Sequence, residues 1–448
     1  MASYMDLQGG HSKVFLWYSD LPTRLPEICR ALHQKEFPLA TKSLLDWMAS
    51  YFVQCQNFPP GKFPNKDIVI QLLDLFVFYQ PLDGFVPKKL TSLDSLQIIE
   101  LLCQFFSTGN SAPIMYSVFD ALFGCSRDSR CDAHRGRMLS QLASMAVSVK
   151  CVPVLNNIAI WLYNQDCSSN SLAMVSSVIQ DFCVLVPESL SSLEALILVC
   201  PQFACQFMTA AVHLFYQTQG PQLQVPNSIP NNLLEVFSKW LDQDYSLCIA
   251  SIQSPLPRVP SFRDPMGYMS RYMCTYISAL PGLVNCCVVG NLGRPTSKGP
   301  NSEIEEKTHV YSRLLFGILQ TLLQAQLLKK GQPQHRVPKE LIDVLQRLLT
   351  AENLKRIVES FKRIVKDCNL LPDSEEVQAS LDRFAQVLQV ALATGTTHCS
   401  RGNVLDICKG LPNNRLLNLI LSHSNKLEVS QKASASPQKQ GLAVPMQH

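Results

Sequence analysis

Proline residues divide this chain into apolar blocks whose spacing is helical. The segment 193–208 is typical: an apolar stretch ends at Cys200, Pro201 follows, and a second apolar stretch starts at Phe203. Proline is tolerated in the first turn of a helix and disrupts the interior, so a proline ahead of an apolar stretch indicates a helix start. The same placement recurs at Pro38, Pro113, Pro153, Pro230, Pro338, Pro372 and Pro412.

Helices of this kind bury their apolar faces by stacking on their neighbours. The low glycine content, 19 in 448 residues, argues against an all-β fold with many tight turns. We therefore predict an all-α fold, arranged as an irregular HEAT- or armadillo-like helical-repeat solenoid with long surfaces for partners. A chain of this length exceeds the size at which a single core usually stops growing, so more than one domain is expected.

Changes in composition predict the domain boundaries. Residues 290–300 are rich in turn-forming residues and lack apolar periodicity, which indicates an exposed linker. The residues after Lys426 lack large apolar side chains at helical spacing, which predicts disorder. The predicted regions are an irregular N-terminal extension (1–35), a helical-repeat domain (36–288), a flexible linker (289–305), a C-terminal helical domain (306–424) and a disordered tail (425–448).

Within the two domains the periodicity predicts an almost continuous series of helices. One begins at Leu39 and ends before Asn57, and Thr91-Ser92-Leu93-Asp94 is typical of a capping box that starts another. Further helices are expected near 68–79, 112–123, 135–150, 153–164, 169–184, 189–199, 202–217, 231–242, 244–253, 266–279, 306–329, 338–350, 351–368, 373–394, 403–409 and 413–423.

Composition restricts the classes of partner. Hydrophobic residues make up 47% of the chain and charged residues 17%, which favours a surface that other subunits cover. The net charge of +4 is too balanced to indicate nucleic acid by itself. The 17 cysteines are scattered, mostly within apolar helix faces, which is typical of reduced thiols in the cytosol or nucleus.

Neither a secretory signal nor a membrane span is predicted. The segment Met1–Asp20 lacks a basic region followed by an apolar core and a cleavage site. Residues 195–212 carry no formal charge and are long enough to cross a bilayer, but Pro201 and several polar residues interrupt them. A buried helical hairpin is the favoured interpretation.

No metal site, cofactor, small-molecule substrate or catalytic residue is predicted. The spacing of Cys125, Cys131 and His134 matches no common zinc site and lacks a fourth ligand nearby. His213 and Cys205 lie eight residues apart, about two turns along one helix, which is too far for direct proton transfer. No nucleophile elbow, zinc-protease motif or Walker A loop is present in the sequence.

One predicted helix, 354–368, carries a basic stripe opposite an apolar face. Such a stripe could contact phosphates or an acidic partner surface, or it could be an ordinary solvated face. Glu352 and Glu359 dilute the charge, and interleaved aromatic residues that could stack on bases are missing. The basic residues are Lys355, Arg356, Lys362, Arg363 and Lys366.

Four segments resemble a known family. They occur in the family's order and span about residues 40–424. The last is the most specific, because its pieces lie in one helix at the family's spacing and include Ser380, Leu381, Asp382, Arg383, Gln386 and Gln389. The segments are Lys89–Leu93 running to Cys103–Phe106, Leu142–Val149 with Pro153–Leu155, Phe182–Pro187 with Pro201–Phe207, and Ser380–Ala391 extending to Leu411–Asn414 and Leu416–Leu417. In these segments the chain resembles the Integrator complex subunit 15 family.

The resemblance implies a nuclear, non-enzymatic, α-helical subunit of the Integrator complex. That complex cleaves nascent RNA polymerase II transcripts, including small nuclear RNA precursors, and its catalytic subunits are other proteins. The family implies a bridge from the module of subunits 10, 13 and 14 to the body of the complex, through subunits 5 and 8. From the residues themselves we expect neither a membrane nor nucleic acid as a direct partner. The two ends of the chain and the linker near 290–305 depart from the family pattern.

The same segments also have a structural interpretation. Ser380 is predicted to cap a helix whose apolar residues pack on the helix 351–368. Asp382 is predicted to lie early in the helix that Ser380 caps and to interact favourably with its N-terminal dipole. Two other hypotheses on function remain: a cytoplasmic helical-repeat adaptor in transport or trafficking, and a weak RNA-binding protein that uses the basic stripe.

Overall fold

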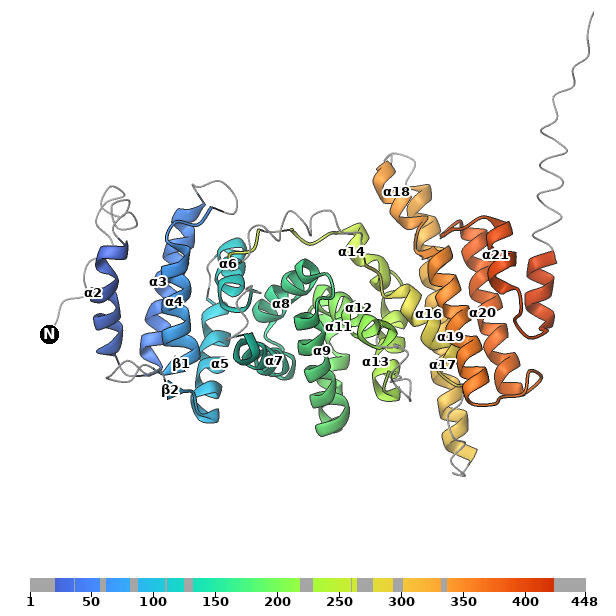
Figure 1. Ribbon diagram of the computed structural model, residues 1–448, viewed down its shortest axis with the longest axis horizontal. Helices are drawn as coiled ribbons and strands as arrows, with labels where there is room; N and C mark the ends of the chain where they lie inside the picture. Colours follow the sequence, from blue (N-terminus) through green and yellow to red (C-terminus); the bar gives the residue numbers. More distant parts are fainter. Residues whose placement is uncertain are drawn as a thin grey trace, which may run out of the picture. The chain divides into compact units, whose positions relative to one another are not determined.

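Helices dominate the computed structural model shown in Figure 1. In the part of the chain that it describes, strands are limited to four two-residue segments, so the predicted all-α class is confirmed. The irregular solenoid arrangement stays a prediction. The structure describes residues 21–35, 37–56, 62–80, 88–108, 111–124, 132–217, 229–258, 260–263, 277–292, 301–331 and 337–422.

The chain forms two compact units. The first comprises Met1–Gln243 and Gln253–Ala279, and the second comprises Asp244–Ile252 and Leu280–His448. The α-helices of the first unit are α2 (Leu21–His33), α3 (Leu39–Cys55), α4 (Lys66–Leu73), α5 (Ser92–Phe106), α6 (Ala112–Phe123), α7 (Asp132–Ser148), α8 (Val152–Gln165), α9 (Ser169–Gln180), α10 (Leu190–Glu194), α11 (Leu196–Val199), α12 (Pro201–Gln217) and α13 (Asn231–Gln243).

Short irregular turns extend two of these helices. A short π-helix, η1 (Asp74–Phe78), continues α4. A second, η2 (Asp181–Leu185), continues α9 and is followed by the short 3-10 helix η3 (Pro187–Ser189). The strands β1 (Tyr79–Gln80) and β2 (Lys88–Lys89) pair antiparallel, with Tyr79 opposite Lys89.

The second unit is built from longer helices. Its strands β3 (Leu349–Thr350) and β4 (Thr397–His398) pair parallel, with Leu349 opposite Thr397. Residues 415–422 form a final helical segment. The other elements are η4 (Leu247–Ile249), α14 (Ala250–Gln253), α16 (Leu280–Val289), α17 (Asn301–Lys330), α18 (Lys339–Leu345), α19 (Ala351–Asp367), α20 (Glu375–Thr394) and α21 (Arg401–Cys408).

Prolines stand at helix starts, as the sequence predicted. Pro113 and Pro153 occupy the first turn of α6 and α8, and Pro201 is the first residue of α12. Pro38 and Pro338 are the N-cap residues of α3 and α18. The first N–H groups of a helix have no intrahelical acceptor, so a proline there sacrifices no hydrogen bond.

The predicted irregular extension, 1–35, is wrong for its last third. Residues Leu21–His33 form α2, in which Pro22 lies in the first turn and Pro26 inside the helix. Leu21 and Leu32 are buried, and α2 contacts α3 and α4. Burying a leucine side chain stabilises by about 1.5–3 kcal/mol, which offsets the helix bond that an interior proline loses. Residues 1–20 lie outside the described residues.

The predicted domain boundary also differs from the structure. No helix was predicted over α16, whose residues fall almost entirely within the predicted first domain, 36–288, but this helix packs on α17, α19 and α20 in the second unit. The turn-rich segment is therefore a connection within the second unit. Of the predicted linker, 293–300 lies outside the described residues and 301–305 is the start of α17. The predicted disordered tail, 425–448, also lies outside them.

Two predicted helices end differently. The helix expected over 338–350 stops at Leu345, because Leu349 and Thr350 pair with β4 and Thr350 caps α19. Of the helix expected near 266–279, residues 277–279 are not helical and 264–276 lie outside the described residues.

Each unit has an apolar core of its own, and the core of the first unit is rich in aromatic side chains. In the first unit Tyr51, Phe119, Trp161 and Trp240 are almost completely buried, where α3 packs on α6, α8 on α12, and α7 on α9. In the second unit α16 is the central element, and its residues Leu280, Leu283, Val284 and Cys287 are all buried. Because α16 is apolar around most of its circumference, it must be covered on several sides.

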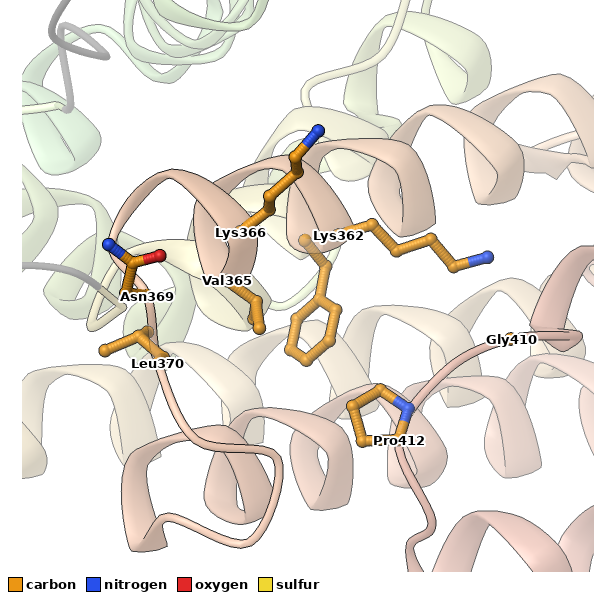
Figure 2. A pocket seen from close by; sticks show the side chains of 8 residues that line it. Lys362, Val365, Lys366, Asn369, Leu370, Gly410 and Pro412 are labelled. Carbon is orange, nitrogen blue, oxygen red and sulfur yellow. The ribbon is translucent and has the colours of Figure 1, made fainter.

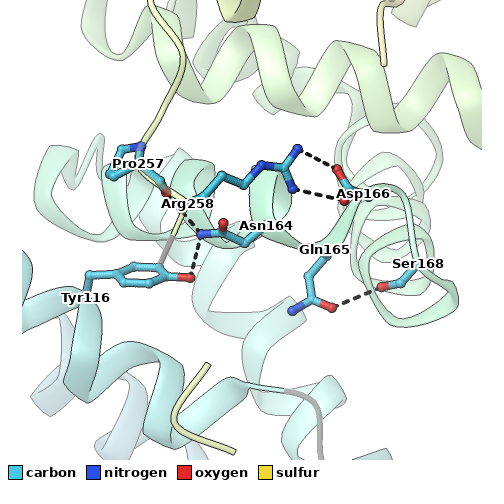
Figure 3. A network of polar contacts seen from close by, with 7 residues as sticks. All are labelled: Tyr116, Asn164, Gln165, Asp166, Ser168, Pro257 and Arg258. Atoms are coloured by element: carbon cyan, nitrogen blue, oxygen red, sulfur yellow. Dashed lines mark hydrogen bonds and ion pairs between the residues drawn. The ribbon is translucent and has the colours of Figure 1, made fainter. Parts of the chain in front are cut away.

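A segment without regular structure, of which 254–258 and 260–263 are described, is held on the first unit by polar contacts. Arg258 forms a bidentate ion pair with Asp166, with N–O distances of 2.9 and 3.0 Å (Figure 3). The Asn164 side-chain amide donates to the Tyr116 hydroxyl and to the Pro257 carbonyl. Backbone groups outside helices need partners when they are buried, and these contacts supply some of them.

The end of this segment inserts into the core between α3 and α6. The Phe262 ring contacts the rings of Phe52 and Phe63 edge to face, and Asp120 accepts hydrogen bonds from the Phe262 N–H and the Ser261 hydroxyl. The segment is therefore part of the framework.

No single helix among the described residues is both long and apolar enough to cross a membrane. One bent pair, Ser169–Leu185 with Pro187–Val199, meets the length and composition criteria only when its two halves are taken together.

The predicted capping box at Thr91 is confirmed and gives a test of helix initiation. The Thr91 hydroxyl accepts from the Asp94 N–H at 3.2 Å, and the Asp94 carboxylate accepts from the Thr91 N–H at 2.9 Å. Thr91→Ala should destabilise the start of α5 by about 1 kcal/mol. Local opening would then be about fivefold more frequent, so amide hydrogen exchange in the first turn of α5 should be about fivefold faster.

Ser111→Ala is the matched control, because Ser111 is the N-cap of α6 but its side chain makes no capping hydrogen bond. It should change exchange in α6 much less. Equal effects of the two substitutions would show that the Thr91 contact contributes nothing to the stability of α5.

Candidate interaction surface

The predicted basic stripe lies on the exposed side of α19. Lys355, Arg356, Arg363 and Lys366 are exposed, and Lys362 is half-buried. The opposite side of the helix is buried through Leu354, Ile357, Val358, Ser360, Phe361 and Ile364. The spacing of charged and apolar residues thus separates the two faces of one amphipathic helix.

Acidic residues on the same face pair with two of the basic side chains. Arg356 contacts Glu352 at 3.1 Å and Lys355 contacts Glu359 at 3.9 Å, both one turn away along the helix. All four side chains are more than half exposed, so each pair contributes little to stability. The other basic residues of the stripe, Lys362, Arg363 and Lys366, lie toward the C-terminal end of α19.

A groove of about 430 Å³ lies beside that end of α19 (Figure 2). Figure 2 shows Val365, Leu370 and Pro412 around the groove, with the Lys362 and Lys366 ammonium groups extending from its edge. We call this feature the α19 groove. Its lining residues are Phe361, Lys362, Val365, Lys366, Asn369, Leu370, Gly410 and Pro412.

One wall of the α19 groove is the turn that ends α19. Asn369 has a positive φ of 51°, its N–H donates to the Lys366 carbonyl, and the Leu370 N–H donates to the Val365 carbonyl at 2.9 Å. This is the Schellman pattern, in which asparagine is one of the few residues besides glycine that tolerate the left-handed conformation. The turn places Leu370 at the groove and leaves Leu371 72% exposed beside it.

The opposite wall is the turn after α21. Gly410 has a φ of 81°, and the Lys362 ammonium donates to the Lys409 carbonyl at 2.8 Å. A Cβ on Gly410 would lie 3.4 Å from that ammonium nitrogen. Lys362 therefore holds the turn after α21 in place, while the Lys366 ammonium lies at the edge of the groove, where a ligand could contact it. Chemically, the site combines an apolar floor with a basic edge.

The family-like residues of α20 form the framework of the second unit. Ser380 is fully buried and its hydroxyl donates to the Val288 carbonyl. Arg383 is also buried: its Nε donates to the Cys287 carbonyl at 2.8 Å, and its guanidinium lies 5.7 Å from the centre of the Tyr311 ring. Both contacts fasten α20 to α16 and α17.

The sequence-based roles of Ser380 and Asp382 are therefore wrong. The N-cap of α20 is Ser374, whose hydroxyl accepts from the Val377 N–H, and the helix continues through Ser380 because Val377 is buried in the core. Asp382 lies in the middle of the helix, away from the N-terminal dipole, and accepts a hydrogen bond from Asn414 at 2.9 Å.

The remaining α20 residues separate into core and surface. Leu381 is buried, Gln386 is half-buried and Gln389 is exposed. The helix packs on α16 and α17, and its Leu381 and Phe384 share an apolar space with Ile357, Val358 and Phe361 of α19. The main neighbours of α20 are thus α16 and α17, and not the helix 351–368 that the sequence predicted.

Sequence reasoning missed the residues that shape the groove. Asn369 and Gly410 each follow a helix and could have been recognised as left-handed turn positions, but nothing in the sequence pairs the two turns. Asn414 connects α20 to the final helical segment, donating to Gln378 and Asp382 and accepting from the Leu417 N–H at 2.8 Å.

The described residues provide no group of three or more His, Cys, Asp or Glu that could hold a metal ion. Of the sequence candidates, Cys125 and Cys131 lie outside the described residues, and His134 stacks edge to face on Phe78.

Fold and groove define a helical protein with an apolar, basic-edged surface groove. The model of the Integrator complex subunit 15 family matches residues 26–413. Human Integrator complex subunit 15 is 29% identical over 416 residues, covering 89% of this chain and 87% of its own length. The zebrafish protein (Danio rerio) of that name is 31% identical over 411 residues, covering 89% and 81%. The chain belongs to the Integrator complex subunit 15 family.

A more distant relative and one solved structure are also similar. The Drosophila melanogaster protein of the same name is 25% identical over 376 residues, with 81% of this chain and 89% of the relative covered. A structure of the TSC2 N-terminus aligns with 14% sequence identity and a TM-score of 0.18, which is too low to establish a common fold.

A pair of substitutions in α20 tests whether the family-like residues are framework. Leu381→Ala should destabilise the second unit by about 2–5 kcal/mol, because it removes a buried side chain and leaves a cavity. Gln389→Ala should change stability by less than about 0.5 kcal/mol, because the side chain is exposed. Hydrogen exchange of α20 across a urea series measures both, and similar small effects would contradict the framework role.

Proposed function

We propose that this chain is a non-catalytic scaffold subunit of the nuclear Integrator complex. The observation that carries the proposal is the family match over residues 26–413. The relatives are also covered over 81–89% of their own length, so the match is not confined to one shared domain. An all-helical chain with two separate cores suits a protein that binds partners through its surfaces.

The finer proposal is a bridge. One part of the chain binds the module of subunits 10, 13 and 14, and another binds the body of the complex through subunits 5 and 8. Such a tether raises the effective concentration of one module beside the other without new chemistry. In this way the chain supports small nuclear RNA 3′-end processing and attenuation of RNA polymerase II transcription, which other subunits carry out.

The α19 groove is the proposed contact of the second unit. Its apolar floor favours a leucine- or phenylalanine-type anchor, and the lysine ammonium groups at its edge favour acidic residues beside that anchor. Phosphates of RNA would also be attracted, but the aromatic side chain of the lining, Phe361, is only 1% exposed and cannot stack on a base. A protein segment is therefore the better fit.

Membership of the complex is tested by affinity purification of the tagged full-length chain from nuclear extract with quantitative mass spectrometry. Other Integrator subunits should be recovered well above an untagged control. Recovery of vesicle-coat or transport proteins in their place would support the adaptor hypothesis and reject this one.

The bridge is tested by depleting the chain and purifying the complex through subunit 5. Subunits 10, 13 and 14 should be lost from the purified material and return when the full-length chain is restored. If their recovery is unchanged after depletion, the chain does not connect the two parts, even if it belongs to the complex.

Charge reversal tests the α19 groove. Arg356→Glu, Arg363→Glu and Lys366→Glu together should lower recovery of at least one Integrator subunit roughly tenfold, since exposed ion pairs contribute about 0.2–1 kcal/mol each. The control reverses Lys330, Lys339 and Arg347, which are exposed in the same unit and change the net charge equally. Equal recovery from both variants would reject the groove as a protein contact, as would loss of RNA binding alone.

A further inference from the structure

Two half-buried cysteines from different helices meet in the first unit. Cys103 lies near the end of α5, and Cys151 immediately precedes α8. The Ser107 hydroxyl, which follows Cys103 by one turn at the end of α5, lies 3.6 Å from the Cys151 sulfur, so the two cysteines lie close together. The Ser107 hydroxyl also donates to the Cys103 carbonyl at 2.8 Å, so it lies over both residues.

The backbone holds Cys151 in one position. Lys150 adopts a left-handed conformation with φ of 55° at the end of α7, and the Cys151 N–H donates to the Ala146 carbonyl at 2.9 Å. The Cys151 carbonyl accepts from the Leu155 N–H, the first bond of α8. The residue is thus fixed between two helix ends, and Pro153 in the first turn of α8 stiffens the start further.

The environment makes the two thiols chemically unequal. The hydrogen bond from Cys103 lowers the pKa of Cys151 to about 6, against the opposing effect of burial, and Ser107 acts in the same direction. The same hydrogen bond, together with burial, raises the pKa of Cys103. The N-terminus of the 14-residue helix α8 also favours a negative charge at this place. In such an arrangement the thiolate reacts with an oxidant to give a sulfenic acid, and the neighbouring thiol then converts the sulfenic acid to a disulfide.

We propose that Cys103 and Cys151 form a reversible dithiol site that hydroperoxides oxidise to a disulfide. The Cys151 thiolate attacks one peroxide oxygen, the O–O bond breaks, and hydroxide leaves, which gives a sulfenic acid. The Cys103 sulfur then attacks the Cys151 sulfur, the S–O bond breaks, and the thiol proton leaves with that hydroxide as water. Each sulfur loses one electron in total and the peroxide gains two. The product ties α5 to α8, and cellular thiols reduce it again.

Other cysteines of the first unit provide an internal comparison. Cys167 is also half-buried and also follows a helix end, but burial and the nearby Asp166 raise its pKa to about 12. At neutral pH it is protonated, so its reaction with peroxide or iodoacetamide should be slow. The Cys167→Ser variant is therefore the matched control.

The test uses the reduced full-length chain treated with hydrogen peroxide and mapped by differential alkylation and mass spectrometry. Cys103 and Cys151 should lose reactivity together and appear as one linked pair of peptides that dithiothreitol separates. In Cys103→Ser, oxidation of Cys151 should stop at a sulfenic acid that dimedone traps. In Cys151→Ser, Cys103 should stay reduced, and Cys167→Ser should form the disulfide like the wild type.

The pH dependence of alkylation is an independent readout. The rate at Cys151 should rise through about pH 6 and level off above it, since the thiolate is the reacting form, and at pH 7 it should exceed the rate at Cys167 by on the order of tenfold or more. Circular dichroism of the reduced variants confirms that they are folded. A folded wild type that forms no Cys103–Cys151 link, or links either cysteine to a different one, would overturn the proposal.

Discussion

The apolar stripes of neighbouring helices depend on one another for burial, and this dependence organises both units. A helix satisfies its own backbone hydrogen bonds but leaves its apolar side chains in water until another helix covers them. In the second unit α16 shows the consequence, because its apolar circumference is covered by α17, α19 and α20 at once. Removing any one of these three helices would expose apolar side chains of α16 at the centre of the core.

Polar side chains act where helix packing alone leaves backbone groups without partners. In the first unit Arg258 and Asp120 fasten the irregular segment 254–263, and in the second unit Ser380 and Arg383 bind carbonyl groups at the end of α16. Buried polar groups of this kind stabilise little in net terms but are costly to leave without partners. They determine how neighbouring elements are aligned, which apolar packing by itself does not.

The α19 groove follows from the same rules. Two helices end in left-handed turns at Asn369 and Gly410, and Lys362 holds the second turn in place. The floor is made of side chains that the framework needs in any case, while the exposed basic residues contribute little to stability. Framework and recognition can therefore vary separately, which suits a subunit of a multi-protein complex.

The fold class could be predicted from the sequence because it depends on local patterns. Prolines at Pro113, Pro153 and Pro201, the capping box at Thr91 and the amphipathic spacing of α19 each act over a few residues. The α2 helix was missed because two prolines outweigh its short apolar pattern in sequence, and only contact with α3 and α4 shows why it forms.

The assignment of α16 to the second unit, the role of Ser380 and the meeting of Cys103 with Cys151 were decided only by tertiary structure. The pairs concerned are 92 residues apart for Ser380 with Val288, and 48 apart for the two thiols (151 − 103). Local spacing carries no information on which distant helix will cover a given face, because many apolar faces could fit it. The sequence thus determined most of the helices and which face of each is apolar. Tertiary packing determined which helices lie against one another.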